Sequence, residues 1–113
     1  MSSGSTFKVA GVTKLHEQWG EDAAEFLVQL HCEVVKSGEP GGEAFQVIVA
    51  SPQQLSRELQ RERRGEFGRG YMFMLDYDER EVVSNLQRLL DRSGSSSWQE
   101  LASFVTRYFD WID

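Results

Sequence analysis

Residues 24–35 alternate between apolar and mixed side chains more regularly than any other part of the chain. Successive side chains of a β-strand point to opposite faces of its sheet, so this period of two predicts a strand with one buried face. The other face mixes apolar, polar and charged residues, so the two faces have different surroundings. The predicted core face is formed by Phe26, Val28, Leu30, Cys32 and Val34.

Two further strands are predicted on the two sides of this segment in the sequence. Residues 7–15, "FKVAGVTKL", alternate and predict a first strand. Residues 43–50 predict a third strand whose buried side is Phe45, Val47 and Val49. The intervening "KSGEPGGE" supplies glycine and proline for a tight reversal, so the third strand should pair antiparallel with residues 24–35.

Three capping boxes predict where helices begin, because a Ser or Asp side chain can accept the first free backbone N–H groups of a helix. Ser51 begins the first helix directly after the third strand, and Gly65 should end it. Asp78 begins the second, which ends at Gly94, and Ser97 begins the third. The predicted buried face of the third helix is Leu101, Phe104, Val105 and Tyr108.

The apolar run from Tyr71 to Leu75 predicts a fourth strand, which completes the order β, β, β, α, β, α, α. We therefore predict an α+β fold, a two-layer sandwich whose mainly antiparallel four-stranded sheet has its helices on one face. Residues 1–5 should be a disordered tail and residues 6–113 a single domain. The predicted uncovered sheet face carries Leu27, Gln29, His31, Glu33, Gln46, Ile48, Met72, Met74 and Asp76.

The formal charge of −6 bears on the partners that this chain can have. An acidic surface repels phosphates, which disfavours nucleic acid and favours a basic protein, although solubility alone would also account for the charge. No apolar run approaches the roughly 20 residues of a membrane span, and the first residues contain no secretory signal. The single cysteine fits a reducing compartment, so we expect a cytoplasmic protein that does not contact the membrane.

Candidate catalytic groups are few. His31 and Cys32 are neighbours on a predicted strand, so their side chains point to opposite faces and cannot act as a base and nucleophile pair. The densest acidic cluster is Asp76, Asp78 and Glu79, but a helix N-cap and first turn account for the last two. We therefore predict no catalytic residue, no metal ligand and no cofactor.

Three segments together resemble the immunity protein 8 family of bacterial polymorphic toxin systems. They are "EAFQVIVASPQQL", "FGRGYMFMLDYDEREVVSNLQRLL" and "SWQELASFVTRYFDW", within residues 24–111. The resemblance implies a small cytoplasmic protein, not an enzyme, that binds and neutralises a cognate toxin domain. Many such toxins are nucleases with basic substrate clefts, which an acidic inhibitor would be attracted to.

The resemblance supplies no binding residues, so the expected contacts come from acids that lie beside apolar groups. On the uncovered face these are His31, Glu33 and Asp76, and at the chain end Asp110, Trp111 and Asp113. Packing in the core would explain Trp111 as well. Two other functions stay open, a scaffolding or regulatory binding module and a small hydrolase that uses Asp76.

Overall fold

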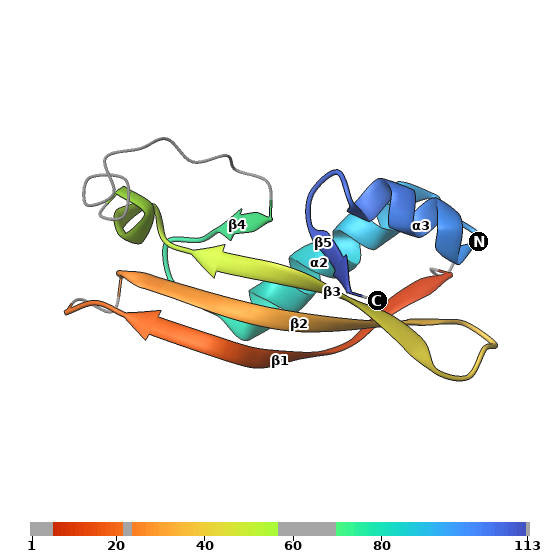
Figure 1. Cartoon of the computed structure of the whole chain (residues 1–113), viewed down its shortest axis with the longest axis horizontal. Helices are drawn as coiled ribbons and strands as arrows, with labels where there is room; N and C mark the ends of the chain where they lie inside the picture. The colour runs from red at the N-terminus through yellow and green to blue at the C-terminus, as the bar shows by residue number, and fades with distance from the viewer. Residues whose placement is uncertain (1–5, 22–23, 57–69, 113) are drawn as a thin grey trace.

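The structure, a computed structural model, describes residues 6–21, 24–56 and 70–112. Its sheet comprises five strands, and two helices of 15 and 8 residues pack against it (Figure 1). The predicted α+β class is therefore confirmed, with a fifth strand that the sequence did not reveal. In chain order the elements are β1 (Phe7–Trp19), β2 (Phe26–Lys36), β3 (Gly42–Ala50), β4 (Tyr71–Phe73), α2 (Glu79–Ser93), α3 (Trp98–Val105) and β5 (Asp110–Ile112).

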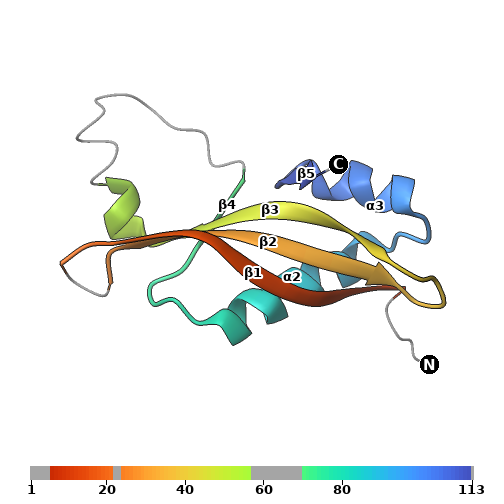
Figure 2. The same cartoon turned by 60° about the horizontal axis from the view of Figure 1, so that its bottom comes forward.

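The sheet is an antiparallel meander with two short strands added at one edge (Figure 2). β1 pairs with β2 and β2 with β3, both antiparallel, as the reversal at residues 37–41 predicts. The far edge of β3 is divided between two partners: β4 runs parallel to residues 48–50, and β5 runs antiparallel to residues 44–46. Two segments that are distant in the sequence, β4 and β5, therefore meet along one edge of β3.

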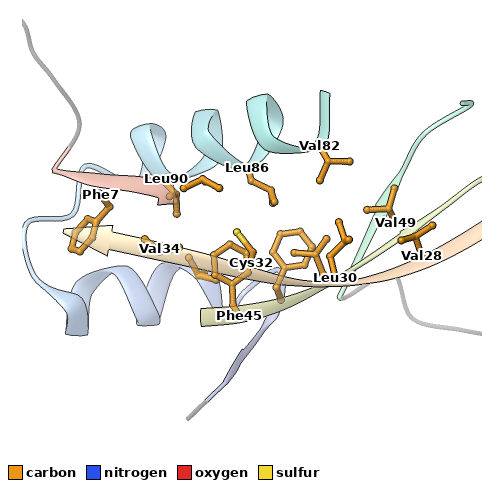
Figure 3. Close-up of a cluster of buried hydrophobic side chains, with 14 of the residues drawn as sticks. Phe7, Val28, Leu30, Cys32, Val34, Phe45, Val49, Val82, Leu86 and Leu90 are labelled. Carbon is orange, nitrogen blue, oxygen red and sulfur yellow. The ribbon is translucent and has the colours of Figure 1, made fainter. Parts of the chain in front are cut away.

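Helices α2 and α3 cover the sheet face that carries the predicted core residues. Figure 3 shows Val82, Leu86 and Leu90 of α2 pointing toward the β2 side chains Leu30, Cys32 and Val34. The core face predicted from residues 24–35 is fully buried in the structure, and so are Phe45, Val47 and Val49 of β3. This confirms the period-of-two assignment for β2 and β3.

The helix starts also follow the predicted caps. Asp78 accepts hydrogen bonds from the backbone N–H groups of Arg80 and Glu81, and Gly94 ends α2 in the left-handed conformation with φ 62°. Ser97 accepts from the N–H of Glu100. Ser51 accepts from the N–H of Gln54, and residues 52–56 are helical. The predicted end of this first helix, at Gly65, lies outside the described residues, as does the predicted tail at residues 1–5.

β1 departs from the prediction because two β-bulges interrupt it. The strand continues to Trp19, beyond the predicted end at residue 15, and its register with β2 shifts between Val9 and Gly11 and again between Lys14 and His16. Each bulge inserts one residue, so the side chains after it change face relative to a strict alternation. Val12 consequently pairs with Cys32 and packs against the core, whereas a strict alternation from Phe7 would place it on the other face.

The end of the chain also differs from the prediction. α3 ends at Val105, so Tyr108 does not continue its buried face and is exposed, and Phe109 is buried instead. The fourth strand is shorter than the apolar run that predicted it, because β4 ends at Phe73 and Leu75 is exposed.

Candidate functional site

The sheet face opposite α2 and α3 is called the open face here. Its side chains are defined by strand register, because residues that pair across strands share a face. One row crosses three strands, with His31 of β2 beside Gln46 of β3 and Gln46 beside Asp110 of β5. The open face comprises Lys8, Thr13, His16 and Gln18 of β1, Leu27, Gln29, His31, Glu33 and Val35 of β2, Gln46 and Ile48 of β3, Tyr71 and Phe73 of β4, and Asp110 of β5.

An aromatic pair lies on the β4 part of this face. Tyr71 pairs with Ile48 and Phe73 pairs with Ala50, and the two rings stack with their centroids 5.8 Å apart and their planes 11° apart. Phe73 is 46% exposed, a large fraction for an aromatic ring. The sequence pattern did not indicate either residue, and it predicted Met72 and Met74 on this face instead. That placement is wrong: Met72 pairs with Val49, and both methionines pack against the core.

Two acidic residues lie on the open face, and a third predicted one does not. Glu33 is two residues from His31 along β2 and pairs with Ala44. Asp110 pairs with Gln46, which in turn pairs with His31, so His31 and Asp110 lie in one row across the sheet. Asp76 lies in an exposed bend after the end of β4, so it is not part of the sheet, contrary to the prediction. The structure therefore brings together His31, Glu33 and Asp110 and leaves Asp76 apart.

Trp111 lies on the opposite, core-facing side of the sheet. It pairs with Phe45, whose ring it stacks on with centroids 6.0 Å apart, and its ring meets that of Trp98 edge to face. Its indole N–H donates a 2.7 Å hydrogen bond to Glu43. These contacts fix Trp111 within the packing of β5 against β3. Asp113 lies outside the described residues.

A hollow of about 610 Å³ lies where β2 and β3 approach their hairpin. His31 and Glu33 line it from β2, and Gly42 and Ala44 line it from β3. It therefore extends the open face toward residues 37–41 and places a carboxylate at its wall. A separate hollow of about 700 Å³ lies between β1 and α2, where the Gln87 amide accepts from Val9 N–H and donates to the carbonyl of Phe7.

The geometry around Cys32 does not support a nucleophile. The thiol is fully buried on the core face, whereas the adjacent His31 is half-buried on the open face. Burial, with a smaller contribution from the charge of Glu33, raises the pKa of the Cys32 thiol to about 12. A thiol with that pKa is protonated at neutral pH and has almost none of the reactive thiolate form. Within the described ranges, no group of three or more His, Cys, Asp or Glu side chains could hold a metal ion.

Comparison with known proteins identifies a family. The model of a protein family described as immunity protein 8 matches residues 5–112, which is nearly the whole chain. No curated protein and no solved structure matches the chain significantly. None of the helices in the described part is long and apolar enough to cross a membrane.

Proposed function

The chain belongs to the immunity protein 8 family, and we propose that it protects the cell that makes it by binding a cognate toxin domain in the cytoplasm, one to one, and blocking it. An immunity protein neutralises a toxin, so the family gives the function in outline, and the proposal adds the mode of inhibition and the compartment. The family match over residues 5–112 carries the proposal. It needs no reaction by this chain, only a stable surface that the toxin recognises.

We further propose that the toxin surface in contact with this protein is basic, as a nuclease cleft would be. The net charge of −6 supports this, because opposite charges accelerate encounter and disfavour unsuitable partners. An electrostatically steered association slows as salt screens the charges. The association rate with the toxin should therefore fall as the salt concentration rises, while the dissociation rate changes much less.

Co-expression tests the proposal. The probe is the C-terminal domain of any large secreted protein that the gene directly upstream of this chain encodes, produced in a host that it kills. Cells that also make this chain should survive, and the two purified proteins should form a complex with one copy of each. A toxin domain from an unrelated system serves as the control and should kill equally with and without this chain. Equal killing by the upstream-encoded toxin with and without this chain would contradict the proposal.

A further inference from the structure

The open face has an apolar part at one end. Leu27 and Ile48 are half-buried there, and the stacked rings of Tyr71 and Phe73 continue the same surface onto β4. Register places Leu27 and Phe73 on the two sides of Ala50. Rings held by a sheet lose little conformational freedom on binding, and aromatic residues often contribute most of the affinity of a protein interface.

The other end of the open face is acidic. Glu33 and Asp110 lie there with His31 and Gln46 between them. Among the described open-face side chains of β2, β3 and β5, none is Lys or Arg, and on the edge strand β1 the open-face cation is Lys8, which pairs with Val35. The described carboxylates at this end of the face outnumber its described cations, so it attracts a basic side chain of a partner.

The size of the open face also suits a protein partner. β2 has 11 residues, which at about 3.3 Å per residue gives a length of about 36 Å. Four strands side by side at about 4.8 Å give a width of about 19 Å, so the face covers on the order of 700 Å². A standard protein interface buries about 800 Å² on each partner. The open face is thus large enough to hold most of one interface.

We propose that the open face is the surface that docks the toxin domain, with Tyr71 and Phe73 as its apolar anchor and Glu33 and Asp110 as its charged part. This inference rests on the proposed function. It defines the partner's chemistry: an apolar patch on the toxin with Lys or Arg side chains at one side of it. A second copy of this chain fits less well, because two copies that each carry a net charge of −6 repel one another.

Paired variants test the two parts of the face. Phe73→Ala removes the exposed ring of the anchor, and Leu75→Ala is its control, because Leu75 is 76% exposed beyond the end of β4. Glu33→Lys reverses a charge on the open face, and Glu81→Lys makes the same change of net charge on α2, which covers the other face. Dissociation constants for the upstream-encoded toxin domain are measured by titration calorimetry, after thermal unfolding has shown that each variant is folded.

Both open-face variants should weaken binding at least about tenfold, and both controls less than about twofold. The loss caused by Glu33→Lys should shrink at high salt, whereas the loss caused by Phe73→Ala should not. Equal losses in a variant and its control, or no loss in either, would overturn the docking surface. If the wild-type chain itself neither binds nor protects, the proposed function fails instead, so the two failures are distinguishable.

Hydroxyl-radical footprinting separates the other possible occupants of the face. Tyr71 and Phe73 should be labelled in the free protein and protected in the toxin complex. Protection in the free protein that grows with protein concentration would show a second copy on the face. Protection in the free protein that is independent of concentration would show another segment of the same chain there. Either result would overturn the proposal.

Discussion

Ser51 makes the most specific stability prediction, because its side chain connects two elements. It is 1% exposed, and its Oγ accepts hydrogen bonds of 3.1 Å from the backbone N–H groups of both Phe26 and Gln54. The first extends the β2–β3 ladder beyond its last pair, and the second caps the helical residues 52–56. Ser51→Ala leaves two buried N–H groups without this partner.

The expected cost follows from those two bonds. Leaving a buried N–H group unsatisfied costs about 1–3 kcal/mol, and the loss of an N-cap alone costs about 1 kcal/mol. Ser51→Ala should therefore lower the free energy of unfolding by about 2–4 kcal/mol, a large part of the roughly 5–15 kcal/mol of a typical domain. Urea unfolding followed by tryptophan fluorescence measures it, and the midpoint should fall by about 1–2 M.

Ser97→Ala is the matched control for this prediction. Ser97 also caps a helix, but its Oγ accepts a single 3.2 Å bond, from the Glu100 N–H, in an exposed position. Its loss should cost about 1 kcal/mol. If Ser51→Ala costs no more than Ser97→Ala, the bond from Phe26 contributes nothing and the reasoning is refuted.

Three further predictions concern the core and the sheet edges. The pKa of Cys32 is about 12 in the folded protein, against an ordinary 9.0. The stability that the protonated thiol contributes is therefore fully present below pH 9 and is lost as pH rises toward 12. Between pH 8 and pH 10.5, wild type should lose about 2 kcal/mol more than Cys32→Ala in urea unfolding, and equal losses would contradict this. Gln87→Ala removes the partner of the Val9 N–H at the β1 edge. It should lower the free energy of unfolding by about 1–2 kcal/mol and increase self-association in sedimentation experiments. A variant that unfolds and sediments like the wild type would show that the Gln87 amide does not protect this edge. Trp111→Ala should lower the free energy of unfolding by about 2–3 kcal/mol in the same urea assay, and Trp111→Phe should lower it by less than half of that. A larger loss for Trp111→Phe would show that the hydrogen bond with Glu43 provides most of the stabilisation.

The features that the sequence predicted correctly are local. The alternation of β2 and β3 and the caps at Asp78 and Ser97 depend on neighbours a few residues apart, and the structure confirms them. The bulges of β1 are harder to see, because one inserted residue reverses the alternation without any Gly or Pro that must accompany it. Val12 therefore appeared to face away from the core.

The features that the sequence did not predict depend on distant pairing. β5 is three residues at the end of a helical pattern, and only its pairing with β3 makes it a strand. The run "YMFML" is apolar on both faces, so no periodicity distinguishes Tyr71 and Phe73 from Met72 and Met74. The parallel register with residues 48–50 decides which pair is exposed. The candidate site was incomplete for that reason: its acidic part was visible in β2, and its aromatic part was not.

The alternation of β2 and β3 also separates stability from recognition. Val47 is fully buried, while its neighbours Gln46 and Ile48 lie on the open face. Shortening a buried valine to alanine removes core contacts and leaves a cavity, whereas substitutions of half-exposed residues away from such contacts usually change stability by less than about 0.5 kcal/mol. With the open face as the proposed docking surface, a chain built in this way can change half-buried residues such as Gln46 and Ile48, and so change its partner, without altering the core that holds those strands in place.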